Sequence, residues 1–497
     1  MSSSYLTVAI PYVNAAPHLG YAYELVLADI AARARRAEAD TALRFLGGTD
    51  DYSLKNATAA AAAGVATAEF VATNARRFAE LAGPLRISFD DFIQTSRDPR
   101  HIPAVQRLWE AVAANGDLYR RAYQGLYCLG CEAFYSPEEL VNGRCPEHDA
   151  ALEIVEEENW FFRLSRYRDY LEDLITSGQL SITPAGFRSE VLAFLRSGLE
   201  DISVSRSAER SGGWGIPVPG DPSQVIYVWF DALVNYISAL GYGEAAGDFS
   251  RWWTGGDDRI HVIGKGITRF HAIYWPAFLA AAGEVPPTRI VVHPYLTVDG
   301  AKLSKSSGPQ LSPTELCETY GADALRWWFA REVHPSVDTD FTKERLVQRA
   351  NEDLAGGLGN LVSRITTLIH RHGHAKVVQP DAAPLVEVEE ACDKAWEAYR
   401  EFQPRDGCEL VLEAVAAANR ELERTQPWQL AQDPTRAGEF DEVVSRLWTS
   451  CVRVTQAVAP VVPDLSARLA GLLAADGGSL PSPEPAFRRL PEPAGSD

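Results

Sequence analysis

Two short stretches far apart in the chain carry residues suited to binding and cleaving a polyphosphate. The first is YVNAAPHLGY at residues 12–21, which lies between an apolar run and a segment with helical periodicity. A helix that begins at such a turn presents backbone N–H groups and a partial positive charge to a phosphate. His18 adds a side-chain donor, and Gly20 allows a nucleotide to approach the backbone closely. Taken alone, the stretch fits equally well an ordinary helix start with a surface histidine.

The second stretch is GAKLSKSSG at residues 300–308, in which Lys302 and Lys305 flank Leu303 and Ser304. In a loop that follows a strand, two ammonium groups can meet the charge that develops when a phosphoryl bond breaks. Taken alone, the same residue types are typical of a solvated loop. The two stretches therefore indicate a nucleotide site only in combination.

Three of the seven cysteines form a candidate metal site together with a histidine. Cys128, Cys131, Cys145 and His148 have the spacing C-x2-C…C-x2-H. Thiolate and imidazole ligands at this spacing are typical of a closed tetrahedral zinc site. Because the protein would fill all four positions, we expect one structural Zn2+ and no catalytic metal here. The alternative is four unrelated residues.

The patterns around these residues predict an α/β fold with a Rossmann-like parallel-sheet nucleotide-binding domain. Short apolar runs alternate with helical patterns over residues 1–115 and 221–340, which predicts βαβ units and two halves of one parallel sheet. Residues 116–220 contain the cysteine cluster and are interpreted as a connective insertion with a zinc knuckle. Helical periodicity predicts an α-helical bundle over 341–480, and the Pro-rich residues 481–497 predict a flexible tail.

Composition and charge exclude several classes of protein. The chain has 497 residues and a formal net charge of -20, which argues against nonspecific coating of nucleic acid, since that binding depends on Lys and Arg neutralising phosphates. The N-terminus lacks the basic and apolar regions of a signal peptide, and no apolar run has the length of a membrane span. We therefore expect a cytoplasmic protein with no membrane partner.

PHLGY and KLSKS resemble HIGH and KMSKS, the two signature sequences of class I aminoacyl-tRNA synthetases. Within that class, IPYVNAAPHLG, GGTDD, ENWFFRLSRY, YVWFDALVNYISAL and HVIGKGITRFHAIYWPAFL resemble segments of the methionyl-tRNA synthetase family, from about residue 5 to residue 430. The cysteine cluster is similar to the single zinc knuckle of some members. The resemblance implies a ligase in which an amino-acid carboxylate attacks the α-phosphate of ATP, with Mg2+, and forms an aminoacyl adenylate.

The resemblance also implies roles for individual residues. The expected catalytic residues are His18, Tyr21, Lys302 and Lys305. The expected ATP-binding residues are Tyr12, His18, Gly20, Tyr21, Gly264, Lys302, Ser304 and Lys305. The expected amino-acid-binding residues are Ile10, Asp50, Trp229, Ala232, Tyr236, Ile267, Phe270 and His271. The expected anticodon-binding residues are Asn360, Arg364 and Trp428, in an anticodon-binding-like bundle.

The physical reasons for these roles are specific. The carboxylate of Asp50 would accept hydrogen bonds from the substrate ammonium group, and aromatic walls suit a polarizable thioether. Without the resemblance, Trp229 and Tyr236 would be interpreted as core residues. Stacking and base-edge hydrogen bonds are what recognition of a single-stranded loop requires.

Several positions depart from the family pattern, among them four near the nucleotide and the pocket. Tyr21 stands where HIGH has its second histidine, and Tyr52, Gly266 and Leu233 replace other residues near the nucleotide and the pocket. Losing a well-placed donor to a developing charge typically costs about 2.7–4 kcal/mol in the barrier. The departures therefore bear on both the rate and the identity of the amino acid.

Two hypotheses differ in the molecule that accepts the activated amino acid, and a third hypothesis assumes no enzymatic activity. In the first, the activated amino acid, methionine or a related one, is transferred to methionine tRNA. In the second, a tRNA-independent paralogue passes it to a small-molecule acceptor, such as an N-hydroxylated amino acid, as in hydrazine-forming enzymes with similar domains. An inactive tRNA-binding scaffold is the third hypothesis, and the retained His18, Asp50, Lys302 and Lys305 argue against it.

Overall fold

The computed structural model describes residues 2–128, 133–135, 140–146, 151–244, 248–298, 301–302, 311–475 and 479–492. The chain divides into two compact units. The first comprises Met1–Glu24, Ala39–Ala82 and Ser88–Tyr295, and the second comprises Leu25–Glu38, Gly83–Ile87 and Leu296–Asp497. The division falls within helices α1 (Leu19–Arg36) and α4 (Ala82–Leu85).

A six-stranded sheet, with every neighbouring pair parallel, forms the centre of the first unit. Its strands, in spatial order, are β3 (Asp91–Gln94), β2 (Thr41–Thr49), β1 (Ser2–Val8), β12 (Asp258–Gly264), β13 (Arg289–His293) and β7 (Ser181–Thr183). The order reverses between β1 and β12, because β2 and β3 extend to one side and β12 and β13 to the other. Such a switch point opens a crevice at the carboxyl ends of the strands, where α/β sheets bind ligands.

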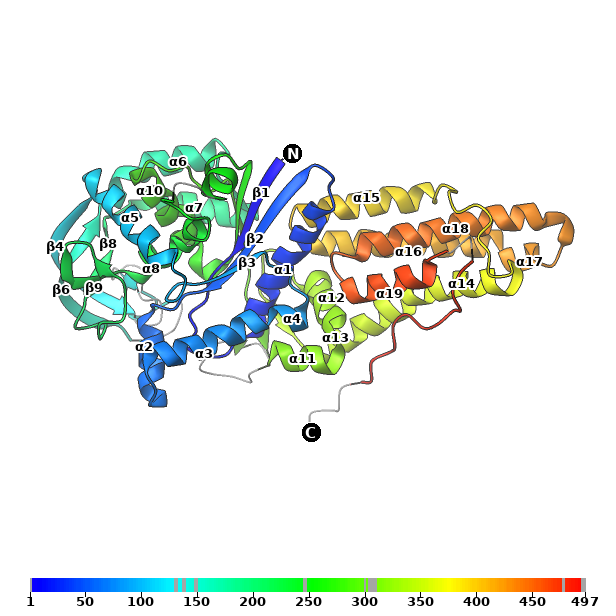
Figure 1. Ribbon diagram of the computed structural model, residues 1–497, viewed down its shortest axis with the longest axis horizontal. Coiled ribbons are helices and arrows are strands. Elements are labelled where there is room, and N and C mark those ends of the chain that lie inside the picture. Colours follow the sequence, from blue (N-terminus) through cyan, green and yellow to red (C-terminus); the bar gives the residue numbers. More distant parts are fainter. Residues whose placement is uncertain are drawn as a thin grey trace. The chain divides into compact units, whose positions relative to one another are not determined.

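The helices of the first unit bury the sheet, as apolar strands that are covered on both faces require. Figure 1 shows α5, α6, α7 and α10 to the left of β1, β2 and β3, and the core includes Phe162, Trp253, Trp275 and Phe278. The helices are α2 (Leu54–Ala63), α3 (Thr67–Glu80), α5 (His101–Ala114), α6 (Arg168–Thr176), α7 (Ala185–Ser197), α8 (Val228–Leu233), α9 (Asn235–Ser238) and α10 (Trp275–Ala281).

Along the chain, strands of two small antiparallel sheets lie between the strands of the central parallel sheet. One sheet has the order β5-β4-β6-β8, and another has the order β10-β11-β9. Their bounds are β4 (Leu118–Cys128), β5 (Ala133–Tyr135), β6 (Glu153–Phe162), β8 (Ile202–Ser203), β9 (Ser205–Ser207), β10 (Pro217–Val218) and β11 (Asp221–Ile226). Strand β7 comes from the range expected to be an insertion, yet it pairs in parallel with β13 at the edge of the central sheet. The domain boundaries expected from the sequence stay predictions.

The second unit is mainly helical, with a small sheet of order β15-β14-β16. The strands are β14 (Leu296–Val298), β15 (Ala301–Lys302) and β16 (Thr339–Phe341), and the helices are α11 (Pro313–Tyr320), α12 (Ala322–Glu332), α13 (Lys343–Arg349), α14 (Asn360–His372), α15 (Val386–Arg400), α16 (Pro404–Thr425), α17 (Pro427–Leu430), α18 (Ala437–Val458) and α19 (Pro463–Leu473). Figure 1 shows α14, α15, α16 and α18 running alongside one another.

Local sequence explains where several of these elements begin. The Ser312 hydroxyl accepts a hydrogen bond from the backbone N–H of Glu315 at the start of α11, and Ser53 caps α2 by accepting from the N–H of Lys55. In α14, buried apolar residues at Leu361, Ile365 and Leu368 lie on one face, as the spacing of an amphipathic helix requires. Among the described residues, no helix has the length and apolar composition needed to cross a membrane.

The described part of the predicted tail is bound to the second unit. Leu490 donates its N–H to Asn351 Oδ1 at 2.7 Å and accepts from Asn351 Nδ2 at 2.9 Å. His370 Nε2 lies 2.7 Å from the carbonyl oxygen of Pro481. The prediction of a flexible tail overlooked these partners, because the side chains that bind the segment come from helices more than a hundred residues earlier in the chain.

Candidate active site

The turn before α1 orients the imidazole of His18. The Nδ1 atom accepts a hydrogen bond from the N–H of Tyr21 at 3.2 Å, so the ring proton of a neutral imidazole lies on Nε2. A Cβ atom on Gly20 would lie 3.1 Å from two atoms of the ring. Glycine at this position therefore makes room for His18, which is a different reason from the nucleotide approach expected from the sequence. With Nδ1 accepting, Nε2–H is the donor of the neutral His18 ring.

Tyr21 is part of a packed contact between α1 and α3. Its side chain is 5% exposed, and its ring centroid lies 5.4 Å from that of Phe78. The hydroxyl group has no hydrogen-bond partner within the part of the chain that the structure describes, and desolvation raises the pKa of the phenol well above its usual value. Tyr21 is therefore an uncharged donor beside the His18 turn, and its catalytic role stays a prediction.

A buried carboxylate and a histidine join the strand ends at the switch point. Glu24 Oε1 accepts the N–H of Ala9, just after β1, at 3.0 Å, and the Glu24 carboxyl group also accepts the N–H of Gly264 at the end of β12. His293 Nε2, at the end of β13, lies 2.9 Å from Glu24 Oε2. Sequence reasoning predicted Gly264 here but missed Glu24 and His293. Two features of the sequence could have indicated them. Glu24 is a charged residue on the apolar face of the helix that begins after the His18 turn, and His293 is a polar residue at the end of an apolar strand.

The predicted amino-acid pocket contains a hydrogen-bonded tyrosine and histidine. His271 Nδ1 lies 3.0 Å from the carbonyl oxygen of Ile267 and must carry a proton, so Nε2 accepts from the Tyr236 hydroxyl at 2.7 Å. Burial lowers the pKa of His271 to about 4, which keeps the ring neutral at pH 7. The rings of Trp229 and Phe270 are stacked, with centroids 3.7 Å apart. The arrangement is aromatic and uncharged.

The segments that follow β1 and β2 supply Ile10 and Asp50. Asp50 is 1% exposed, its N–H donates to the carbonyl oxygen of Pro11 at 3.0 Å, and it forms a parallel bridge with Tyr12. A Cβ atom on Gly48 would lie 2.6 Å from the carbonyl oxygen of Ile93 and 2.9 Å from Ile10 Cγ2. Gly48 in β2 therefore permits the close approach of Ile93 from β3 and of the Ile10 side chain.

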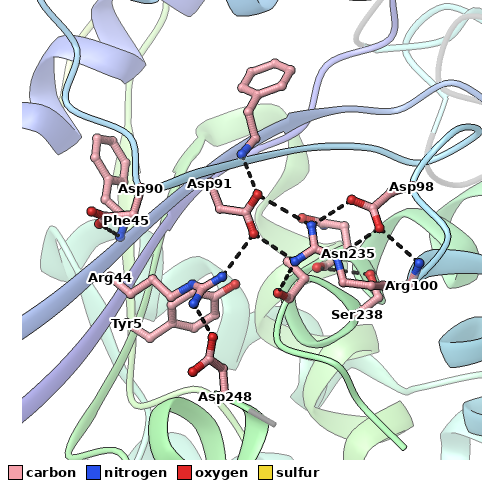
Figure 2. Close-up of polar contacts among 12 residues, drawn as sticks. Tyr5, Arg44, Phe45, Asp90, Asp91, Asp98, Arg100, Asn235, Ser238 and Asp248 are labelled. Atoms are coloured by element: carbon pink, nitrogen blue, oxygen red, sulfur yellow. Dashed lines mark hydrogen bonds and ion pairs between the residues drawn. The ribbon is translucent and has the colours of Figure 1, made fainter. Parts of the chain in front are cut away.

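A charged network holds the helix that carries Tyr236. Figure 2 shows Arg44 and Arg100 converging on Asp91, with nitrogen to oxygen distances of 3.0 and 2.9 Å. Arg100 Nη1 also donates to the carbonyl oxygen of Ala239 at 2.8 Å, and the Tyr5 hydroxyl donates to that of Tyr236 at 2.8 Å. The two bonds fix the backbone within α9 and at the residue that follows it, so the pocket tyrosine has a defined position.

The positions that depart from the family pattern lie beside these groups. Leu233 is buried next to Ala232 in α8, and Gly266 lies in the short 3-10 helix η4 (Lys265–Ile267) after β12. The Tyr52 ring contacts that of Trp214 at 5.4 Å, and burial raises its pKa to about 12. Tyr52 is therefore neutral at physiological pH.

Several predicted residues lie elsewhere or outside the described part of the chain. Lys302 belongs to β15 of the second unit and is described by its backbone, whereas Ser304 and Lys305 lie outside the described residues. Cys131 and His148 also lie outside them. Within the described ranges, no group of three potential metal ligands occurs, and the zinc site stays a prediction.

The predicted anticodon residues lie on helices of the second unit. Asn360, at the start of α14, is exposed, and Arg364 lies one turn later on the same face. Arg364 donates to Asn419 Oδ1 at 3.0 Å and to Glu423 Oε1 at 2.6 Å. Trp428 is half-buried in α17. Their part in recognising tRNA stays a prediction.

Comparison with known proteins identifies the family. The model of the family described as tRNA synthetases class I (M) matches residues 4–153 and 148–366. The methionine–tRNA ligase of Brucella suis biovar 1 (strain 1330) is 39% identical over 515 residues, covering 98% of this chain and 98% of the relative. The chain belongs to the methionyl-tRNA synthetase family. The family resemblance inferred from PHLGY and KLSKS is thereby confirmed.

Other members of the family support the same assignment. The methionine–tRNA ligase of Thermotoga maritima is 37% identical over 478 residues, covering 93% of this chain and 74% of the relative. The solved structure of Mycobacterium tuberculosis methionyl-tRNA synthetase in complex with methionyl-adenylate matches with a TM-score of 0.91 and 35% identity, covering 98% of this chain and all of that one. The α/β fold class with a C-terminal helical region is confirmed, and the chain is a ligase that forms an aminoacyl adenylate.

Proposed function

We propose that this chain is a methionine–tRNA ligase, which activates methionine with ATP and transfers it to methionine tRNA. The observation that carries the choice of amino acid is the uncharged group of aromatic residues, in which neutral His271 bonds to Tyr236. Burying a charged side chain there without a partner would be costly, whereas the stacked rings of Trp229 and Phe270 suit a polarizable thioether. The relative from Mycobacterium tuberculosis binds methionyl-adenylate.

The proposed reaction has two steps. A carboxylate oxygen of methionine attacks the α-phosphorus of ATP, the bond to the β-phosphate oxygen breaks, and pyrophosphate leaves. His18 Nε2–H, Lys302 and Lys305 would stabilise the developing charge on the phosphates, and Asp50 would hold the substrate ammonium group. Bound Mg2+ would supply further neutralisation of the phosphates. A terminal hydroxyl of tRNA then attacks the carbonyl carbon, and AMP leaves.

Exchange and transfer assays test the activity directly. We expect isotope exchange between pyrophosphate and ATP with methionine in preference to the other amino acids, and then methionine transfer to methionine tRNA. Absence of exchange with every amino acid would contradict amino-acid activation. Transfer to N6-hydroxylysine and not to tRNA would contradict the tRNA ligase and favour a small-molecule acceptor, for which the names of the relatives give no support.

Recognition of tRNA is proposed for the second unit. A half-buried tryptophan such as Trp428 can stack on an unpaired base, and stacking is worth about 1–3 kcal/mol per base. We expect Trp428→Ala to raise the KM for tRNA by about tenfold in the transfer assay. Equal KM values for the variant and the original chain would contradict this role. The expected cytoplasmic location stays a prediction.

A structural Zn2+ completes the proposal. The side chains of Cys128, at the end of β4, and Cys145 are each 1% exposed, and buried thiols on a short insertion suit a structural zinc. With Cys131 and His148, they would hold the ion and cross-link the insertion. Metal analysis should find stoichiometric zinc in the purified chain and less in Cys145→Ser, whereas Cys317→Ser should retain it. A zinc-free chain that is fully folded and active would contradict the site.

A further inference from the structure

The most informative group outside the predicted site is the buried pair formed by Glu24 and His293. The two residues are 5% and 6% exposed. Glu24 projects from α1, and His293 ends β13, so the pair lies at the carboxyl ends of the central strands. As the family resemblance did not indicate either residue, their function has to be derived from the geometry.

The contacts of His293 require a proton that a neutral imidazole lacks. Nδ1 lies 2.8 Å from the carbonyl oxygen of Pro294, which can only accept, so Nδ1 carries a proton. Nε2 lies 2.9 Å from Glu24 Oε2, which is also an acceptor when ionised. A neutral ring carries a single proton and can therefore donate to only one of these two oxygens. The observed contact needs one more proton, either on Nε2 or on the carboxyl group.

The carboxyl group that shares this proton also binds two strand ends. It accepts the N–H of Ala9 after β1 and the N–H of Gly264 at the end of β12, the two strands that flank the switch point. Removing the proton leaves one ring N–H for two acceptors, so a lone pair of the ring then faces either Glu24 or the carbonyl oxygen of Pro294, and that contact at a strand end opens. When it is the contact with Glu24 that opens, Ala9 and Gly264 lose their shared acceptor position.

Among the described residues, three tyrosine phenols interact with the pair. Tyr23 of α1 contacts the His293 ring edge-on at 5.2 Å, and Tyr21 of α1 and Tyr236 of α9 interact electrostatically with Glu24. Burial raises the pKa of all three phenols, so they stay protonated. Lys265, after β12, lies over the Tyr295 ring at 4.7 Å. Desolvation raises the pKa of Glu24, which favours retention of the shared proton at neutral pH.

We propose that the proton shared by Glu24 and His293 positions the strand ends for ATP, so that affinity for ATP falls when alkaline pH removes it. Glu24 and His293 are thus positioning residues for the nucleotide and act through the backbone of Ala9 and Gly264. The inference rests on the proposed ATP-dependent activation.

The variant Glu24→Gln removes the need for the shared proton while it keeps the hydrogen bonds of the side chain. Its amide oxygen can accept from Ala9 and Gly264, and its amide nitrogen can donate to Nε2 of a neutral His293, so that no extra proton is required. In pyrophosphate exchange, we expect the KM for ATP of the original chain to rise about tenfold or more between about pH 7 and about pH 9.5, as for loss of a hydrogen bond to a charged group. The KM of Glu24→Gln should change less than about twofold.

Because Glu24→Gln retains every lysine of the chain, titration of Lys302 or Lys305 affects both proteins equally. The KM for methionine should show no such difference between them. Equal pH dependence of the KM for ATP in both proteins would overturn the inference.

Calorimetry with a non-hydrolysable ATP analogue gives a second readout that does not depend on activity. At alkaline pH, binding to the original chain should take up a proton, because affinity and protonation are linked, and the uptake should be absent in Glu24→Gln. Binding without proton uptake by the original chain would overturn the inference even if the variant failed to fold. Failure of exchange with every amino acid, together with normal proton uptake, would instead overturn the proposed function.

Discussion

Helix α1 contributes a carboxylate to each of two buried ion pairs, and the two pairs differ in whether their positive charge can be lost. Glu24, in the first unit, pairs with His293, and Asp29, in the second unit, pairs with Arg326 at 2.8 Å. Arg326 is fully buried and donates to the carbonyl oxygens of Leu85, Pro460 and Val461 at 2.7–2.9 Å. A guanidinium group keeps its charge at any physiological pH, whereas the histidine pair depends on a shared proton.

The difference indicates two roles for one helix. Its pair in the second unit stabilises the fold, and its pair in the first unit adjusts the position of a binding site. The Arg326 side chain joins three separate segments, and its carbonyl partners remain bonded at any pH. The His293 pair joins strand ends at the ligand crevice, where a change in protonation alters geometry. Burial alone therefore does not identify a functional charge, because the ability to titrate and the location also matter.

Breaking the permanent pair should have the largest effect. In Arg326→Leu, the buried Asp29 would lose a guanidinium partner, and three carbonyl oxygens would lose a donor. Removing one partner of a buried ion pair typically costs about 3–5 kcal/mol. Urea unfolding followed by circular dichroism of the full chain should show this loss for the helical unit.

A control variant breaks an ion pair that is partly exposed. Arg453→Ala, which removes the pair with Asp393, should cost less than about 1 kcal/mol. A similar loss of stability in Arg326→Leu and Arg453→Ala would contradict the contrast between buried and exposed pairs.

His271 provides a contrast with His293, because its buried ring is hydrogen-bonded to a tyrosine hydroxyl and a backbone carbonyl oxygen instead of a carboxylate. Burial lowers its pKa from 6.5 to about 4, so between these pH values the unfolded chain binds a proton that the folded chain does not. The contribution of His271 is fully present above pH 6.5 and is lost as pH falls to about 4, with a total of about 3 kcal/mol.

The measurement is the free energy of unfolding of the chain and of His271→Gln, compared at about pH 7 and about pH 4.5. The difference between the two proteins isolates His271 from other groups that titrate in this range. We expect the variant to lose less stability on acidification. A parallel loss in both proteins would show that His271 does not contribute.

A milder change to the permanent pair should give a smaller effect. Asp29→Asn retains an acceptor for Arg326 and Arg33 but removes the negative charge, so the expected loss is about 1–3 kcal/mol. Urea unfolding at several pH values should show a loss that is constant from about pH 6 to about pH 9. A strong pH dependence in this range would place a titrating group in the cluster and remove the distinction from Glu24.

The smallest effect is expected for the neutral bond in the pocket. Tyr236→Phe removes the donor to His271 Nε2 and leaves that atom buried, at a cost of about 1 kcal/mol, the lower end of the range for an unpaired buried acceptor. We expect a KM for methionine about tenfold higher in pyrophosphate exchange, with the KM for ATP unchanged. The reverse pattern would place Tyr236 in nucleotide binding.

The sequence predicted those parts of the site that depend on local spacing. His18 and Gly20 were recognisable because a turn between a strand and a helix has a short signature, and the structure places both at the start of α1. The local pattern did not reveal that Gly20 accommodates the His18 ring, since this depends on a side-chain rotation. Nor did it reveal that the ring of Tyr21 packs against Phe78 from α3.

The amino-acid sequence by itself determined the family, the α/β class and the elements that carry the nucleotide turn, because helices, strands and turns follow from residues close together in the chain. Tertiary structure decided which buried charges meet. Glu24 and His293 are 269 residues apart, and Asp29 meets Arg326 only after the chain has folded. Partners at such separations have no spacing to detect in a single sequence, so the protonation that their contacts require could be derived only from the distances in the folded chain.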